Sequence, residues 1–114
     1  MKAPNTFSKR EFYQNKSVVR IEWCLDTCYL PNLRWARLRV FEDGTADSCF
    51  NQGGKIYAFE NRDYASYILS EDEYTNFENM DIADEQEYGI NLTAIAPPLW
   101  QDTFEQEFEY LETY

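Results

Sequence analysis

The chain of 114 residues contains no histidine. Histidine is the commonest general base of enzymes, the commonest transition-metal ligand and the usual pH switch near neutrality. Its absence excludes the serine, cysteine and zinc chemistries that rely on imidazole. Because the sequence also lacks a glycine-rich phosphate loop and a nucleophile motif, we expect a protein that is not an enzyme.

Long hydrophobic runs are missing as well. No apolar run approaches the roughly 20 residues of a membrane span, and residues 1–5 lead into no apolar segment typical of a secretory signal. We therefore expect a cytoplasmic protein that does not bind membranes. Its three cysteines, Cys24, Cys28 and Cys49, cannot all pair within one chain and are too few for a four-ligand zinc site, so we expect free thiols.

Basic residues are scarce beyond residue 40. Residues 1–40 hold eight basic and three acidic side chains, whereas residues 41–114 hold two basic and eighteen acidic ones, for a net charge of −11. Basic residues flank an aromatic ring in the segment that contains Arg34, Trp35, Arg37 and Arg39. Proteins that bind single-stranded nucleic acids combine cations and aromatic rings in a similar way. The overall charge repels phosphate, so we expect no nucleic-acid binding and predict that these arginines meet the chain's own carboxylates.

What the sequence does have is aromatic density. Tyrosine, phenylalanine and tryptophan make up 18% of the chain, and hydrophobic residues make up 44%, enough for one core in one domain of residues 1–114. Residues 1–16 are polar and basic, and we expect a flexible N-terminal arm in which Ser8 and Glu11 form a capping box for a short helical turn. Residues 81–89 are predicted to be an acidic loop.

Alternating apolar and polar residues predict strands over residues 17–25, 34–41 and 55–59. A hairpin turn follows the second strand, and its length decides the register of the third. A two-residue loop would set Val40 opposite Asp47, which mixes a core residue with a carboxylate. A three-residue loop with Gly44 in a left-handed conformation pairs Val40 with Ala46 and Arg39 with Asp47, so we predict the longer loop.

Helices are expected after the fourth strand. Asn61 is a good N-cap for a helix over 61–69, and a capping box over 70–73 predicts a second short helix. Residues 90–95 could form a last strand, and a C-terminal helical segment is indicated by a stripe of Trp100, Phe104, Phe108 and Leu111. The fold class is therefore predicted as α+β: an antiparallel meander of four to five strands, two short helices after strand 4, and a C-terminal helical segment.

The densest group of carboxylates lies between residues 71 and 87, where eight acidic side chains occur without one basic residue. Calcium takes six to eight oxygen ligands, often from a flexible acidic loop. The candidate metal ligands are Glu78, Asp81, Asp84, Glu85 and Glu87. No window has the glycine and glutamate spacing of an EF-hand, and a solvated acidic loop without an ion explains the same residues.

A short, acidic, histidine-free chain with the unneutralised stretch 81–87 resembles the small acidic calcium-binding protein family of filamentous cyanobacteria, which lacks EF-hands. The resemblance rests on size and charge. It implies reversible Ca²⁺ sequestration and calcium signalling during heterocyst differentiation, and it implies no catalysis.

Two functions remain open from the sequence. The first is a calcium-binding buffer or sensor with Ca²⁺ as its cofactor and partner. The second is an acidic protein-interaction module, of the DNA-mimic, immunity or inhibitor type, that covers the basic surface of a partner protein. The second predicts an ordered acidic face and binding that weakens steeply with salt.

Overall fold

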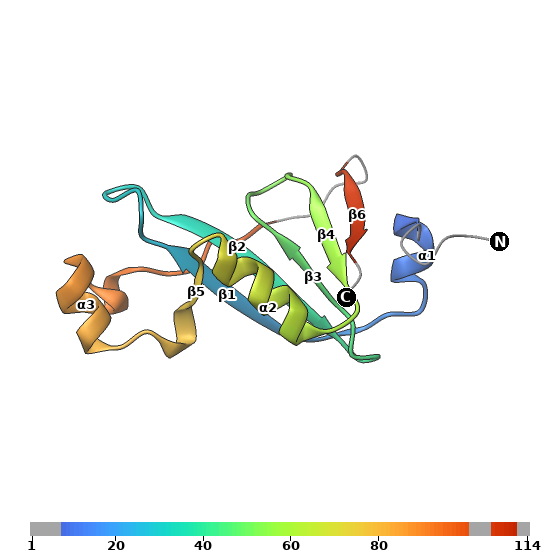
Figure 1. Cartoon of the computed structure of the whole chain (residues 1–114), viewed down its shortest axis with the longest axis horizontal. Coiled ribbons are helices and arrows are strands. Elements are labelled where there is room, and N and C mark those ends of the chain that lie inside the picture. Colours follow the sequence, from blue (N-terminus) through green and yellow to red (C-terminus); the bar gives the residue numbers. More distant parts are fainter. Residues whose placement is uncertain (1–7, 101–105, 112–114) are drawn as a thin grey trace.

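A six-stranded mixed sheet forms the centre of the fold in the computed structural model, which describes residues 8–100 and 106–111. The strand order is β5-β1-β2-β3-β4-β6, and β1 and β2 are the longest strands (Figure 1). The strands are β1 (Val18–Asp26), β2 (Arg34–Phe41), β3 (Ala46–Cys49), β4 (Ile56–Phe59), β5 (Thr75–Asn76) and β6 (Phe108–Leu111).

The strands β1 to β4 follow one another as antiparallel neighbours, which confirms the predicted meander. β5 pairs antiparallel with β1, and β6 lies parallel to β4. The α+β class is therefore confirmed. The prediction of four or five antiparallel strands is corrected to six strands with one parallel pair.

The hairpin between β2 and β3 has the predicted three-residue loop. Val40 pairs with Ala46, and Arg39 pairs with Asp47. Gly44 has φ of +90°, a conformation that glycine adopts without the steric penalty of a side chain. The turn thus keeps apolar residues of both strands on one face and the Arg39–Asp47 pair on the other.

The helix α2 (Arg62–Glu71) covers one face of the sheet, as Figure 1 shows. It begins as predicted, because the side chain of Asn61 accepts a hydrogen bond from the backbone N–H of Tyr64. Ala65 and Leu69 point from α2 into the main core. The buried residues of this core are Cys24, Ala36, Leu38, Ala46, Phe59, Ala65, Leu69 and Tyr74.

A second, smaller cluster lies on the opposite face. The helix α1 (Lys9–Tyr13) begins at Ser8, whose side chain accepts from the N–H of Glu11 as the capping box predicts. Phe12 is buried against Phe41 and Ala58. Within the predicted N-terminal arm, Phe12 thus packs on the sheet; residues 1–7 lie outside the described part.

The predicted C-terminal helix is also corrected. Residues 101–105, which include Phe104 of the predicted stripe, lie outside the described residues, and the segment after them is the strand β6. Phe108 and Tyr110 pack on Phe12, whereas Leu111 packs on the main core. A spacing of two residues places side chains on the same face of a strand, so this arrangement requires an extended chain.

The acidic segment departs from the prediction too. Residues 81–89 form the helix α3 (Ile82–Tyr88) and its C-cap Gly89 rather than a loop. Residues 70–73 open no second helix, because α2 continues through Glu71. Residues 90–95 contain a single 3-10 turn (Leu92–Ala94) and no strand. Within the described residues, no helix combines the length and apolarity needed to cross a bilayer.

Candidate functional site

Three of the five residues predicted to bind calcium accept hydrogen bonds from backbone N–H groups in or next to α3. The side chain of Asp81 accepts hydrogen bonds from the N–H groups of Ala83 at 3.0 Å and Asp84 at 3.3 Å. The Asp84 side chain accepts from the N–H of Asp81 at 2.9 Å, which completes a capping box. Glu85 accepts from the N–H of Leu92 at 3.1 Å. Three of the five predicted ligands therefore hold local structure.

The other two predicted ligands, Glu78 and Glu87, are exposed. Among residues 8–100 and 106–111, no group of three or more Cys, Asp or Glu side chains is placed to hold a metal ion. Calcium binding therefore stays a prediction, and the geometry of the acidic segment adds no support to it.

The basic side chains show a clearer pattern, because most of them are paired within the chain. Arginines around Trp35 meet carboxylates, as predicted: Arg39 bonds Asp47 at 2.6 Å, and Arg34 lies 3.6 Å from Asp26. Further ion pairs are Lys16–Asp43, Arg20–Glu22 within β1, Arg62–Glu22 and Lys55–Glu109.

The carboxylates after α2 have no such partners. Among the described residues, none of the eight acidic side chains between residues 71 and 87 forms an ion pair, and six of them are exposed. Among the described residues, unpaired negative charge is therefore concentrated between residues 71 and 87. We call these residues the acidic surface: Glu71, Asp72, Glu73, Glu78, Asp81, Asp84, Glu85 and Glu87.

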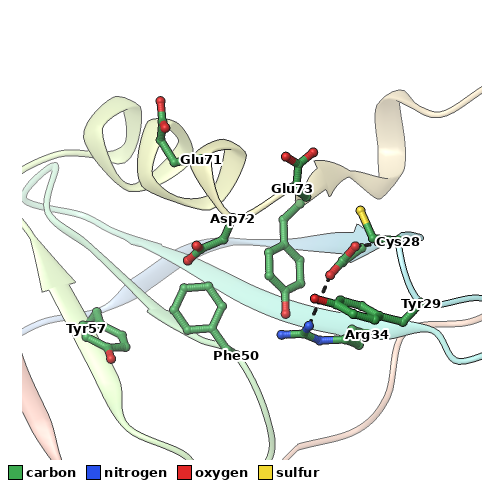
Figure 2. A pocket seen from close by; sticks show the side chains of 10 residues that line it. Cys28, Tyr29, Arg34, Phe50, Tyr57, Glu71, Asp72 and Glu73 are labelled. Atoms are coloured by element: carbon green, nitrogen blue, oxygen red, sulfur yellow. Dashed lines mark hydrogen bonds and ion pairs between the residues drawn. The ribbon is translucent and has the colours of Figure 1, made fainter.

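A hollow of about 520 Å³ lies where the acidic surface meets the sheet. Figure 2 shows that it lies between the end of α2 and the strands below it, with Asp72 turned toward Phe50 while Glu71 and Glu73 point away from the sheet. Its lining residues are Asp26, Cys28, Tyr29, Arg34, Phe50, Tyr57, Glu71, Asp72, Glu73 and Tyr74.

Aromatic rings form the floor of the hollow. The ring of Phe50 lies edge-on to Tyr57 at 5.6 Å and tilted against Tyr74 at 5.5 Å. Figure 2 shows Phe50 and Tyr57 on one side and Tyr29 on the other. Aromatic faces carry negative electrostatic potential and attract cations.

The hollow also carries an excess of negative charge. Four of its lining residues are carboxylates and one, Arg34, is a cation. Asp26 is buried, accepts from the N–H of Cys28 at 2.8 Å and faces the guanidinium of Arg34, which lies 4.9 Å from the ring centre of Tyr29. Burial raises the pKa of Tyr74, and neighbouring Arg34 opposes that shift, so the phenol stays neutral near pH 7.

The turn that builds this site ends α2 abruptly. Asp72 is the C-cap of α2, and Glu73 has a left-handed φ of +68°, which is uncommon for a residue with a side chain. The N–H of Tyr74 then donates to the carbonyl of Leu69 at 3.0 Å. This turn places Asp72 over the hollow and sends Tyr74 back into the core.

The hollow could not be predicted from the sequence because its lining comes from the end of β1, the β1–β2 connection, β2, the end of β3, β4 and the end of α2. No motif links those segments. The only sequence signal that pointed here was the run of carboxylates over 71–73, which was assigned to a helix cap.

No known protein family, curated protein or solved structure matches this chain. The resemblance to the cyanobacterial calcium-binding family therefore stays an expectation from size and charge.

Proposed function

We propose that the protein is an acidic interaction module that binds the basic surface of a partner protein. The observation that carries this proposal is the uneven pairing of charge. The described arginine and lysine pairs neutralise carboxylates on the sheet, whereas the acidic surface has no cation of its own among the described residues. A concentrated, unneutralised field of one sign accelerates association with a partner of the opposite sign.

The hollow supplies an anchoring point within this surface. A lysine or arginine side chain of the partner would lie over the rings of Phe50 and Tyr57 with its charge beside Asp72. A cation over an aromatic face contributes about 0.5–2 kcal/mol, the larger values applying when water is excluded. Anchors in such hollows commonly dominate the affinity of an interface, while surrounding charges set its association rate.

Calcium binding is the other candidate from the sequence, and no observation of the structure favours it over the interaction module. Asp81, Asp84 and Glu85 already accept backbone hydrogen bonds. An ion would have to compete with those bonds, which would cost α3 part of its N-terminal cap.

The proposal is tested with a fluorescent peptide of eight arginines as the probe. Binding to the full chain is measured by anisotropy at about 50 mM and about 300 mM NaCl, because screening shortens the reach of charge over this range. We expect saturable binding that weakens at least tenfold at the higher salt concentration. Binding that is absent at low salt, or unchanged by salt, would overturn the proposal.

The role of the hollow is tested with two variants of equal charge. Asp72→Asn changes the carboxylate over the hollow, whereas Asp63→Asn changes one that is 93% exposed in the first turn of α2. We expect Asp72→Asn to weaken peptide binding about three- to tenfold and Asp63→Asn to weaken it less than twofold. Equal effects would keep the acidic surface as the binding site and remove the hollow as its anchor.

A further inference from the structure

All three tryptophans of the chain lie against one another beside the start of β2. The ring of Trp23 lies edge-on to Trp35, with centres 6.3 Å apart, and to Trp100, with centres 5.1 Å apart. Trp35 also meets Phe77 of the 3-10 turn after β5 at 5.0 Å. Each of the three tryptophans is only half-buried. Tryptophan is enriched among the residues that dominate the affinity of interfaces, so this group offers a partner an unusually favourable contact.

A second hollow, of about 360 Å³, lies against this group. We call it the tryptophan hollow. Among its described lining residues, only Arg34 is charged, and its guanidinium is turned to Asp26 and to the ring of Tyr29. The tryptophan hollow is therefore largely apolar and is roomy enough for one large apolar side chain. Its lining residues are Leu33, Arg34, Trp35, Phe50, Asn51, Pro98 and Trp100.

The tryptophan hollow adjoins the hollow beside the acidic surface, because Arg34 and Phe50 line both. Figure 2 shows Phe50 below Asp72 and Arg34 beside Tyr29, so the two shared residues come from opposite sides of the first hollow. The chemistry changes across this boundary. Four carboxylates line the first hollow, whereas the described lining of the second includes none. A site for a cation and a site for an apolar side chain are therefore neighbours on one surface.

We propose that the tryptophan hollow binds a large apolar side chain of the same basic partner. The surface would then recognise an extended basic segment that carries a leucine, or a residue of similar size, two positions from its anchoring arginine or lysine. The inference rests on the proposed function, because the acidic surface supplies the attraction that brings the segment to this place. It adds specificity, since a basic surface without the apolar side chain would leave the tryptophan hollow unfilled.

An extended segment suits two adjoining hollows. Side chains two residues apart in an extended chain point to the same side and lie about 7 Å apart. The side chain between them points away, so it is free to be of any type. With the basic side chain over Phe50 and beside Asp72, the next side chain on that side reaches the part of the surface that Phe50 shares with the tryptophans.

The two contacts respond differently to salt. Salt screens the attraction between the basic side chains and the acidic surface. Burial of an apolar side chain depends on its removal from water and is not screened in this way. The contribution of the tryptophan hollow can therefore be measured separately from that of the charges.

Two fluorescent eight-residue peptides of equal charge test the proposal. Both have seven arginines, and the fourth residue is leucine in one and serine in the other. Binding to the full chain is measured by anisotropy at about 50 mM and about 300 mM NaCl. We expect the leucine peptide to bind about fivefold more tightly than the serine peptide at both salt concentrations, because only leucine gains from burial.

Three variants with the same new residue locate the contact. Leu33→Ser changes the lining of the tryptophan hollow, and we expect it to reduce the preference for leucine to less than twofold while the serine peptide binds as before. Leu99→Ser is the control, because Leu99 is 95% exposed and lies outside that lining. Since Leu33 also lines a hollow beside α3 with Ile90, Ile90→Ser tests that neighbour. Both of these variants should keep the fivefold preference.

The outcomes separate this inference from the proposed function. Equal affinity of the two peptides for the wild-type chain, a preference that survives Leu33→Ser, or one that Ile90→Ser removes equally would overturn the role of the tryptophan hollow. Salt-dependent binding of the serine peptide would still support the acidic interaction module in each of these cases. Failure of both peptides to bind at the lower salt concentration would overturn the inference and the proposed function together.

Discussion

Arg62 of α2 and Glu22 of β1 are joined by two hydrogen bonds, 3.0 Å from Nε and 2.7 Å from Nη2. Glu22 is only 4% exposed, and Arg20 and Asn76 complete its hydrogen bonding. The bond from Arg62 is the largest cause that lowers the pKa of Glu22 below its ordinary value of 4.5. This carboxylate therefore ties α2, β1 and β5 together while it is ionised.

We expect Glu22→Gln to lower the free energy of unfolding by about 2–3 kcal/mol at pH 7, because two guanidinium groups lose their charged partner. The lowered pKa means that the stabilisation is complete above pH 4.5 and is lost as the pH falls through the pKa of the folded state. The difference in unfolding free energy between Glu22→Gln and the wild-type chain should therefore be smaller at acidic pH. Urea denaturation at pH 7 and pH 3 measures both values.

The matched control is Glu109→Gln, whose carboxylate pairs with Lys55 at the surface. We expect little change in stability at either pH, because exposed pairs contribute little. If the difference in unfolding free energy between Glu22→Gln and the wild-type chain is the same at pH 7 and pH 3, the ionic role of Glu22 is contradicted.

The central strands could be predicted because each side chain's environment alternates along them. The Arg39–Asp47 pair could be predicted as well, because only one hairpin length kept both faces consistent. The strand β6 could not. Phe108 fits a helical stripe with Trp100 as well as a strand face with Tyr110, and only the contact of both rings with Phe12 decides between them.

The sequence predicted the concentration of negative charge in the acidic surface, but it did not predict that residues 82–88 form a helix. The helix α3 has no buried residue, so no periodic pattern of apolar residues indicates a helix there. It begins at the Asp81–Asp84 capping box and ends at Gly89. The hollow lay beyond sequence reasoning for another reason. Its floor joins Phe50 and Tyr57 to the turn after α2, and that turn depends on a left-handed Glu73.

The capping role of Asp81 predicts a local effect. Asp81→Ala removes the acceptor for the N–H groups of Ala83 and Asp84 and should destabilise α3 by about 1 kcal/mol. Hydrogen exchange of the amides at residues 85–89 is expected to accelerate. Glu87→Ala, which changes an exposed carboxylate outside the cap, should leave that exchange nearly unchanged; equal acceleration in both variants would contradict the capping role.

Calcium is tested separately by thermal melts. Because Asp81 and Asp84 are already engaged as caps, we expect the same Tm, within about 1 °C, with 1 mM Ca²⁺ and with a chelator, since only a ligand of the folded state raises it. A clear rise with Ca²⁺ would favour the calcium-buffer hypothesis over the interaction module.

The three thiols should differ sharply in reactivity. Cys24 and Cys49 are buried and Cys28 is exposed, and burial is the main cause that raises the pKa of Cys24 to about 11. We expect one fast reaction with Ellman's reagent in the folded protein and three after denaturation. The variant Cys28→Ser should show no fast reaction, and a second fast thiol in the wild-type chain would contradict the buried positions.

The buried Asp47 predicts a dependence on alkaline pH. Asp47 is fully buried, bonds Arg39 at 3.0 and 2.6 Å, and accepts a further hydrogen bond from the hydroxyl of Tyr13. Burial raises the pKa of Tyr13 above its ordinary value of 10.0, and the charge of Asp47 raises it further. Tyr13→Phe keeps the ring against Phe12 but removes the donor, so we expect a loss of about 1–2 kcal/mol at pH 8.

The sign of the pH effect tests whether folding raises the pKa of Tyr13. Because folding raises the pKa of Tyr13, the folded state holds its proton more tightly, and stability is lost as the pH rises above 10.0. The Tyr13→Phe variant has no such proton to lose. The loss of unfolding free energy in Tyr13→Phe relative to the wild-type chain should therefore narrow between pH 8 and pH 11 in urea denaturation. A loss that stays constant over this range would contradict a raised pKa of Tyr13 in the folded state.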